Sequence, residues 1–414
     1  MKYTYIVILC SLLLSCKNEN YWGFTSIDLK AANFKELKVN SSNIKTISIN
    51  PETNKEIQLS KLIDTCYTVI LETTENNLIG KVDEIKIHHD NIYILDKNIS
   101  KSVFVFDIEG KFIRKIGQKG KGPGEYIRPD GFEIDKKNKE LLIPNTAIRK
   151  ILRYDFEGNF LGDIDIKVAF LDFKILDNGN FVLLAGDEAN THLNELKRKE
   201  LYITKRNFEI IQYGPSRSYF KNVKYAPEAN LMSQNNKISY AYKLSDTLLV
   251  LDNNELTASY KLDFGKHSIN KKKLQATNTG EFFNGILKQM NKSAYFLGNH
   301  FQTKDYIYFS YLYKEKSLRC FYNKNQSILL EGASINDTSD NFLFYPFRSA
   351  YNDYFIASAN ISNILDVEKR LKTNDELAYK SYLKLFKSEG ELKFKDSDNP
   401  ILVFYKFKKD YHED

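Results

Sequence analysis

Cysteine, proline and long apolar runs are all scarce in this sequence. Only 4 Cys and 8 Pro occur among 414 residues. The cysteines are scattered, which excludes a metal site built from a cluster of Cys ligands. Beyond the N-terminus no apolar run approaches the roughly 18 residues of a membrane-spanning helix. We therefore expect no transmembrane segment inside the chain.

A concentrated basic surface is also missing. The 60 Lys and Arg residues exceed the 53 Asp and Glu residues by only 7, and they are spread along the chain. Binding to nucleic acid phosphates needs basic side chains gathered on one face. We therefore expect no nucleic acid partner.

The N-terminus carries a targeting segment. Lys2 precedes an apolar stretch at Tyr3–Leu14, and Ser15 and Cys16 follow it. A small residue before a Cys at this point resembles a bacterial lipobox, which implies cleavage before Cys16 and acylation of its sulfur. The alternative is an ordinary secretory signal with an incidental Cys. We predict a signal peptide at 1–15, a tether at 16–43 and a folded domain at 44–414.

These features predict an outer-membrane lipoprotein that faces the periplasm or the cell surface. The mature protein would be a monomeric body held at the membrane by its lipid. Two cysteines remain in that body, Cys66 and Cys320, and both lie in strand-like runs. A disulfide between them is possible in an oxidising compartment. We favour two buried free thiols, because Cys packs as a small hydrophobic residue.

Aromatic residues are plentiful, and a repeat organises them. The 27 Tyr and 28 Phe residues favour strands. Hydrophobic runs that follow Asp-, Asn- or Gly-rich turns begin at Phe112, Phe160, Phe208 and Leu256, always 48 residues apart. A fifth begins at Ile328, after a polar insertion near 270–292 that we expect to be partly helical. This period, with four strands in each unit, is typical of a β-propeller blade.

The C-terminal part predicts a sixth blade that lacks one strand. Strand-like runs occur at 347–351, 354–359 and 401–407, interrupted by a helical insertion near 366–387. Too few residues remain for a fourth strand. We predict that the unpaired run at 67–71 supplies it and closes the ring, which removes exposed sheet edges. The expected fold is an all-β, six-bladed β-propeller with four-stranded antiparallel blades.

One glycine-rich loop carries a family resemblance. The run IGQKGKGPGEY at 116–126 resembles the six-bladed β-propeller lipoproteins of Bacteroides-type bacteria, whose architecture is similar to NHL and TolB-like propellers. Weaker matches lie at 71–80, at 244–247 with 262–265, and at 399–403. The resemblance implies a propeller on a membrane lipoprotein and no settled activity.

The same loop is a poor phosphate site. Gly117 and Gly122 have the spacing of a phosphate-binding loop, but Pro123 and Gly124 stand where Lys and Ser or Thr are needed. We interpret the loop as the connection between two blades. Glu125 and Tyr126, which end it, would lie near one face of the ring, where a ligand could contact them.

Polar residues that open the inner strands are the candidate ligand-binding residues. Arg128 and Asp130 open the second blade, and Tyr345 and Arg348 open the sixth. Arg suits carboxylate groups because its guanidinium forms two parallel hydrogen bonds, and aromatic rings suit sugar faces. The alternative is that Arg128 and Arg348 form structural ion pairs between blades.

Two functions follow from this sequence. The first is a binding or scaffold propeller for a glycan, a peptide or an outer-membrane protein, and it is favoured because no catalytic motif is present. The alternative is a metal-dependent lyase or hydrolase with zinc or calcium on the channel axis. Its candidate ligands are His88, His89 and His300, which lie near the ends of predicted inner strands. We predict no resident cofactor, and the lyase analogy comes from fold alone.

Overall fold

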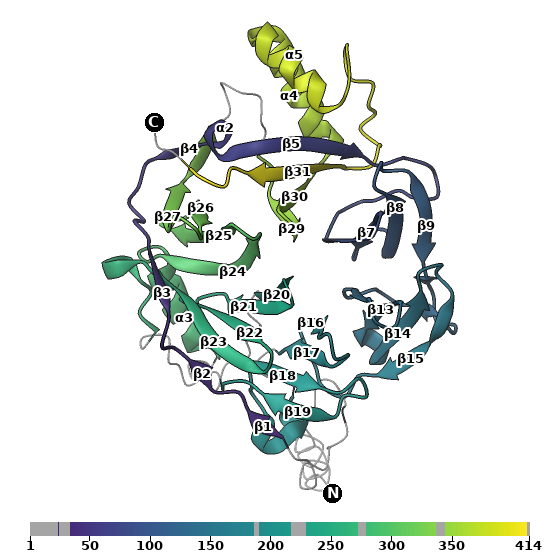
Figure 1. Ribbon diagram of the computed structural model, residues 1–414, viewed down its shortest axis with the longest axis vertical. Coiled ribbons are helices and arrows are strands. Elements are labelled where there is room, and N and C mark those ends of the chain that lie inside the picture. Colours follow the sequence, from purple (N-terminus) through teal and green to yellow (C-terminus); the bar gives the residue numbers. More distant parts are fainter. Residues whose placement is uncertain are drawn as a thin grey trace, which may run out of the picture.

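The computed structural model describes residues 24, 34–185, 190–216, 229–271, 279–336 and 344–411. Six antiparallel four-stranded sheets surround a central axis, so the predicted six-bladed β-propeller is confirmed (Figure 1). From the innermost strand outward the blades are as follows: blade 1, β6 (Glu84–His88), β7 (Asn91–Asp96), β8 (Ser102–Asp107) and β9 (Phe112–Ile116); blade 2, β12 (Glu133–Asp135), β13 (Glu140–Asn145), β14 (Lys150–Asp155) and β15 (Phe160–Asp165); blade 3, β16 (Asp172–Ile175), β17 (Phe181–Leu184), β18 (Leu201–Thr204) and β19 (Ile210–Tyr213); blade 4, β20 (Ala229–Gln234), β21 (Lys237–Tyr242), β22 (Thr247–Asp252) and β23 (Glu255–Asp263); blade 5, β24 (Tyr295–Gln302), β25 (Tyr306–Tyr313), β26 (Lys316–Asn323) and β27 (Ile328–Gly332); blade 6, β29 (Phe347–Tyr351), β30 (Tyr354–Ala359), β31 (Ile401–Phe407) and β5 (Ile63–Ile70).

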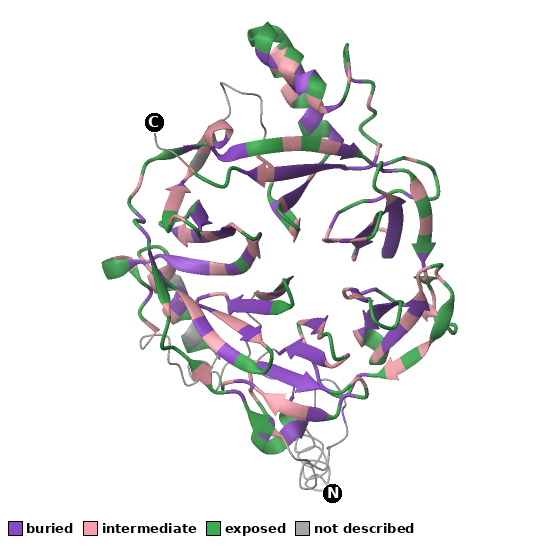
Figure 2. Ribbon diagram, viewed as in Figure 1, coloured by how far each residue is buried: buried purple, intermediate pink, exposed green. Residues whose placement is uncertain are grey.

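The core lies between neighbouring blades. The second and third strands of a blade are covered on both faces, so they read as continuous hydrophobic runs, whereas the outer strands alternate (Figure 2). Between blades 1 and 2, for example, Tyr93 and Val105 pack in one buried cluster with Leu141 and Leu152. Each blade therefore depends on its neighbours for a complete core.

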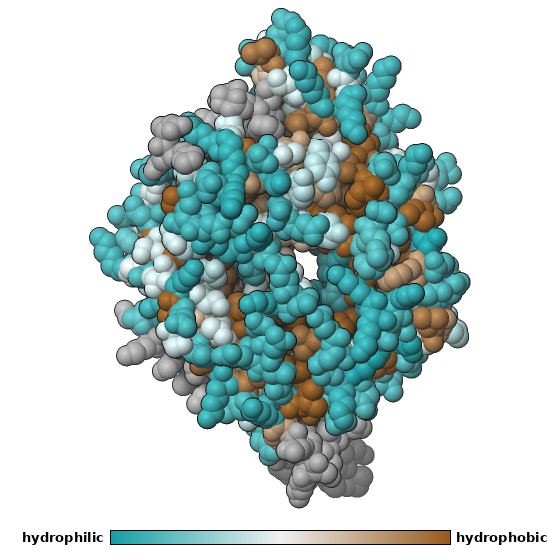
Figure 3. All heavy atoms as spheres, in the orientation of Figure 1, coloured by the Kyte–Doolittle hydropathy of each residue, from teal (hydrophilic) through white to brown (hydrophobic). Residues whose placement is uncertain are grey.

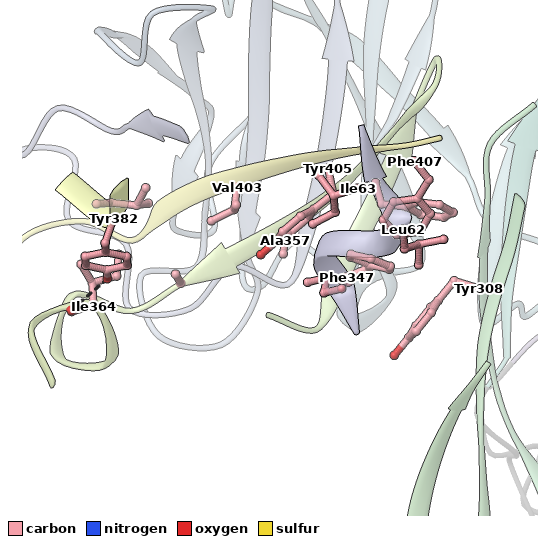
Figure 4. Packing of buried hydrophobic residues seen from close by; sticks show 14 of the residues in the cluster. Leu62, Ile63, Tyr308, Phe347, Ala357, Ile364, Tyr382, Val403, Tyr405 and Phe407 are labelled. Atoms are coloured by element: carbon pink, nitrogen blue, oxygen red, sulfur yellow. Dashed lines mark hydrogen bonds between the residues drawn. The ribbon is translucent and has the colours of Figure 1, made fainter. Parts of the chain in front are cut away.

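The ring closes in blade 6 as the sequence predicted. β5 pairs antiparallel with β31, with Val69 opposite Leu402, so an N-terminal strand is the outer strand of the last blade. Tyr405 and Phe407 of β31 pack with Ile63 and with Phe347 of the inner strand β29 (Figure 4). This packing joins the two ends of the propeller through a hydrophobic core.

An N-terminal strap, which was not predicted from the sequence, follows the outside of the ring. β1 (Lys35–Glu36) pairs parallel with β19, and β2 (Val39–Asn40) and β3 (Lys45–Ser48) pair parallel with β23. Further along, β4 (Glu56–Gln58) pairs with β28 (Ser334–Asn336), just after the outer strand of blade 5. The last part of the segment expected to be a tether is therefore held against blades 3 and 4 (Figure 1).

Both predicted insertions contain helices. α3 (Thr279–Met290) lies between blades 4 and 5, and α4 (Ile361–Asn374) and α5 (Glu376–Leu385) lie between β30 and β31. Figure 1 shows α4 and α5 projecting from blade 6. Within the described ranges, no helix combines the length and the apolar composition needed to cross a bilayer.

The antiparallel order of the strands gives the ring two distinct faces. Each inner strand begins at one end of its blade, and the turn between the second and third strands lies at that same end. We name this end the upstream face; it also carries the connections between blades. The opposite face carries the other two turns of blades 1 to 5 and the β29–β30 turn of blade 6. For example, Lys97 in the β7–β8 turn of the upstream face bonds the carbonyl oxygen of Asp130, just before β12, at 3.1 Å.

Candidate functional site

A cavity of about 700 Å³ runs along the axis of the propeller. Residues of all six inner strands line it, together with residues just before these strands and just after them. The space-filling view shows an opening near the centre of the ring (Figure 3). Ligand sites are commonly concave regions of this size, so the axial cavity is the candidate site.

Blades 1, 2 and 3 contribute a chain of alternating charges to the cavity. Lys86 lies 2.7 Å from Glu84 and 2.9 Å from Glu133. Lys174 lies 3.1 Å from Glu133 and 3.8 Å from Asp172. We name these five residues the charged arc. Each charge has an opposite charge beside it, but three carboxylates face two lysines, so the arc has a net charge of −1.

Burial and pairing act in opposite directions on the charged arc. Burial alone would raise the pKa of Glu133, but Lys174 and Lys86 outweigh it, so the pKa lies below its usual value. Burial alone would lower the pKa of Lys174, but Asp172 and Glu133 raise it overall. Both residues are therefore charged at neutral pH, and the pair joins blade 2 to blade 3.

Blades 4, 5 and 6 line the cavity differently. Their lining includes the uncharged polar residues Ser233, Asn299 and Ser349, together with Arg348. Arg348 is exposed and makes no ion pair or hydrogen bond with another described residue. The cavity therefore combines one half with many charges, most of them in ion pairs, and another half whose described lining holds Arg348 as its one charged residue.

Two of the six residues predicted to bind a ligand reach the cavity, Asp130 and Arg348. Asp130 is already occupied, because its Oδ1 accepts hydrogen bonds from Arg128 at 2.7 and 3.0 Å and its Oδ2 accepts one from the Thr146 N–H at 2.8 Å. These bonds and Lys97 hold the pKa of Asp130 below its usual value, although burial acts to raise it. Arg128 thus pairs within its own blade rather than between blades.

The other three predicted residues lie away from the cavity. Glu125 accepts hydrogen bonds from the Gly122 N–H at 2.8 Å and from Gln118 at 2.6 Å, which folds the glycine-rich loop onto itself. Tyr126 is fully buried and donates to the Ile116 carbonyl at 2.8 Å. Tyr345 is half-buried against the hydrophobic cluster of blade 6. The structure gives Glu125 and Tyr126 internal partners in a connection between blades.

The charged arc was missed from the sequence, although a signal for it exists. Glu84 and Lys86 are two residues apart, as are Asp172 and Lys174, so both members of each pair point to the same side of an inner strand. Paired opposite charges two residues apart at the start of a blade would have indicated an axial cluster. That they meet through Glu133 depends on how the blades are arranged around the axis.

The three candidate metal-binding histidines do not meet. His88 and His89 contact each other in the β6–β7 turn, with ring centroids 4.0 Å apart, and His88 also contacts Phe156. His300 is fully buried elsewhere, with its Nε2 2.7 Å from the Ser239 hydroxyl. Among the described residues no group of three or more His, Cys, Asp or Glu side chains is arranged to hold a metal.

The two cysteines of the body are free thiols, as expected. Cys320 is buried, and burial raises the pKa of its thiol well above the usual value, so it is unreactive. Cys66 is only half-buried, not fully buried as predicted, because it lies on the outer strand of blade 6. Cys16 lies outside the described residues.

The fold and its axial cavity define the class of protein: a six-bladed β-propeller with a candidate binding site on its axis. Residues 44–406 match the family described as Domain of unknown function (DUF4934), and the chain belongs to that family. None of the curated proteins matches the sequence.

Solved structures share the fold. A Bacteroides fragilis protein designated an exported protein is 20% identical, with a TM-score of 0.67, over 89% of this chain and 100% of its own. A member of the DUF4221 family from Bacteroides vulgatus is 12% identical, with a TM-score of 0.48, over 84% and 97%. Virginiamycin B lyase from Staphylococcus aureus is 8% identical, with a TM-score of 0.38, over 70% and 80%. At 20% identity, the Bacteroides fragilis structure shows that the two chains share a fold.

Proposed function

We propose that this protein is a cell-envelope lipoprotein, anchored through Cys16, whose propeller binds a carboxylate-bearing ligand in the axial cavity. The ligand is a glycan, a peptide or a segment of an outer-membrane protein. The observation that carries the proposal is Arg348, which has no described partner and is the one charged residue that blades 4, 5 and 6 contribute to the described cavity lining. The exported designation of the Bacteroides fragilis relative supports a place in the envelope.

The charge distribution favours binding over catalysis. A general acid or base needs a pKa near the working pH, whereas Glu133 and Lys174 are held fully charged by each other. Arg348 can offer two parallel hydrogen bonds to a carboxylate. The nearby Ser233, Asn299 and Ser349 can bond sugar hydroxyls or peptide groups.

Affinity measurements with matched probes test this function. The probes are an oligogalacturonate and its neutral counterpart, and a short peptide with a free or an amidated carboxyl terminus, measured by calorimetry. We expect at least one carboxylate probe to bind more tightly than its neutral counterpart. Arg348→Ala should then weaken binding about 10- to 100-fold, the size of a lost charge-assisted hydrogen bond.

Arg370→Ala is the matched control, because Arg370 is also an exposed Arg but lies in helix α4, outside the cavity lining. It should leave the affinity unchanged. Equal binding by Arg348→Ala and the wild type, or no preference for either carboxylate probe, would show that Arg348 does not bind an anion. A cross-linked pull-down of the intact lipoprotein from its membranes then identifies a protein ligand, if one supplies the carboxylate.

A further inference from the structure

Five large hydrophobic side chains are exposed on one side of the upstream face. They come from connections and turns of blades 1 to 3, and their exposed fractions range from 38% to 65%. We name them the apolar patch: Leu78, Ile99, Ile127, Ile148 and Leu171. Among the described turns of the opposite face, the corresponding exposed residue is Ile108, at 36%. The asymmetry marks the upstream face of blades 1 to 3 as a surface that contacts something apolar.

Contacts between the loops join four of the five patch residues, Leu78, Ile99, Ile127 and Ile148, into one surface. Ile99 lies directly on the loop that holds Leu78, because a Cβ at Gly80 would come within 2.3 Å of its side chain. Asp130, three residues after Ile127, bonds both Lys97 and the N–H of Thr146. These bonds bring the turns that carry Ile99 and Ile148 against the connection that carries Ile127.

Phe24 attaches the N-terminal chain at the edge of this surface. It is buried, its ring centroid lies 4.8 Å from that of His192, and the Arg149 guanidinium lies 5.8 Å from the centroid of Phe24. Arg149 directly follows Ile148 of the patch, and His192 lies in the connection between the second and third strands of blade 3. The chain therefore meets the ring on the upstream face, between blades 2 and 3.

The chain length from Cys16 to Phe24 limits the distance from membrane to ring. Eight residue steps separate the two positions, and a fully extended chain spans about 3.3–3.6 Å per residue. Phe24 therefore lies within about 29 Å of an acylated Cys16. A lipid on Cys16 would therefore keep the upstream face between blades 2 and 3, where the patch lies, within reach of the membrane surface.

We propose that the apolar patch rests on the surface of the bilayer that holds the lipid of Cys16. This proposal depends on the lipid anchor in the proposed function. The patch side chains would insert at the level of the headgroups, and the exposed cations Lys121, Arg149 and Lys167 on the same connections would meet lipid phosphates. A lipid anchor and a surface patch together hold a protein more firmly than either does alone.

This orientation determines which end of the axial cavity is open to water. The upstream end, near Asp130 and Arg348, faces the membrane over blades 1 to 3, whereas the opposite end faces water. Lys136, Lys137 and Asp177 line that opposite end. A soluble ligand reaches Arg348 from the opposite face, through the cavity.

Nitroxide labels on the intact, acylated protein test the orientation. Single cysteines replace Ile99, Ile148 or the control Ile108 in a Cys66→Ser background, and each labelled protein is reconstituted in vesicles of phosphatidylethanolamine and phosphatidylglycerol. On vesicle binding, the accessibility of labels at 99 and 148 to a water-soluble paramagnetic nickel reagent should fall at least fivefold. The accessibility of the label at 108 should not change. Equal accessibility at all three positions overturns the proposal, as does protection that appears only in native membranes, which would indicate a protein partner.

Two further measurements distinguish a missing lipid anchor from a wrong orientation and test whether the patch side chains cause the protection. Mass spectrometry of the N-terminal peptide establishes whether Cys16 is acylated; an unmodified Cys16 contradicts the lipid anchor itself, whereas an acylated protein with accessible labels contradicts only the orientation. In a protein labelled at Ile127→Cys, the pair Ile99→Asp and Ile148→Asp should restore accessibility. Ile108→Asp should have no effect. All these positions are exposed, so the substitutions leave the fold intact.

Discussion

Tyr67 of β5 stacks on Phe404 of β31, with ring centroids 4.7 Å apart and ring planes 7° from parallel. The two residues lie opposite each other where the N-terminal strand completes the last blade. Burial, with a smaller effect of Tyr354, raises the pKa of the Tyr67 hydroxyl to about 12, so the ring remains uncharged. The closure of the ring thus rests on side-chain packing as well as on backbone pairing.

Replacing Tyr67 with Ala should destabilise the whole propeller. The stacked pair contributes about 0.5–1.5 kcal/mol beyond the burial of its surface, and Tyr67 is 36% exposed. We expect the free energy of unfolding, measured in urea, to fall by about 2 kcal/mol. Leu377→Ala is the control, because Leu377 is 78% exposed and should change this value by less than about 0.5 kcal/mol. Similar values for the two variants would show that the stack does not stabilise the closure.

The architecture could be predicted because its signals are local. The middle strands of a blade are buried on both faces, so each reads as a hydrophobic run, and turns rich in Asp, Asn and Gly separate the runs at a constant interval. The closure could be predicted as well, because one run near the N-terminus had no partner and the last blade lacked a strand. The strap could not be predicted. Its strands have two to four residues and bury only single apolar side chains, such as Ile47 and Ile57, so no hydrophobic run marks them in the sequence.

The residues behind the family resemblance are structural. Asn399 is buried; its Oδ1 accepts a hydrogen bond from the Ile79 N–H at 2.8 Å and its Nδ2 donates to the Glu72 carbonyl at 2.8 Å. It thereby joins two stretches that the sequence presented separately, 71–80 and 399–403. Leu262 similarly donates its N–H to the Asp246 carbonyl at 2.7 Å. Such residues specify how the propeller is built rather than what it binds.

The candidate site was only partly predictable for a related reason. Arg128 and Arg348 occupy similar places before or at the start of an inner strand, and the sequence offers no way to separate them. The difference arises because Asp130 lies two residues from Arg128 and bonds it, whereas no described residue pairs with Arg348. Which polar side chain is unmatched depends on contacts between loops that are distant in sequence.

Replacing Glu133 with Gln tests the charged arc. The substitution keeps the shape of the side chain but leaves Lys86 and Lys174 without the carboxylate that pairs them at 2.9 and 3.1 Å. Removing one partner of a buried ion pair costs about 3–5 kcal/mol. We therefore expect the free energy of unfolding, measured in urea at pH 7, to fall by about 3 kcal/mol. Glu376→Gln is the control, because its pair with Lys380 is exposed to solvent and should leave the free energy of unfolding nearly unchanged.

The effect of Glu133→Gln should diminish in acid. The pKa of Glu133 in the folded state lies below its ordinary value of 4.5, so the carboxylate stabilises the fold above that pH. This stabilisation is lost as the pH falls through the folded-state pKa. The difference between wild type and Glu133→Gln should therefore be full at pH 7 and smaller at pH 3.5. A difference independent of pH would mean that Gln disturbs packing rather than charge.

His300 should make the stability of the propeller depend on pH in a higher window. Burial lowers the pKa of His300 from 6.5 to about 4, so the unfolded chain binds a proton more readily than the folded protein between these values. The free energy of unfolding should therefore be highest above pH 6.5 and should fall by about 3 kcal/mol between pH 6.5 and pH 4, since each pKa unit is equivalent to 1.36 kcal/mol.

His300→Gln retains a polar partner for the Ser239 hydroxyl, which lies 2.7 Å from the His300 Nε2, but cannot titrate. This variant should lose most of the slope in urea unfolding measured at intervals across the window, whatever its stability at pH 7. Equal slopes for the wild type and His300→Gln would show that His300 does not titrate in this range.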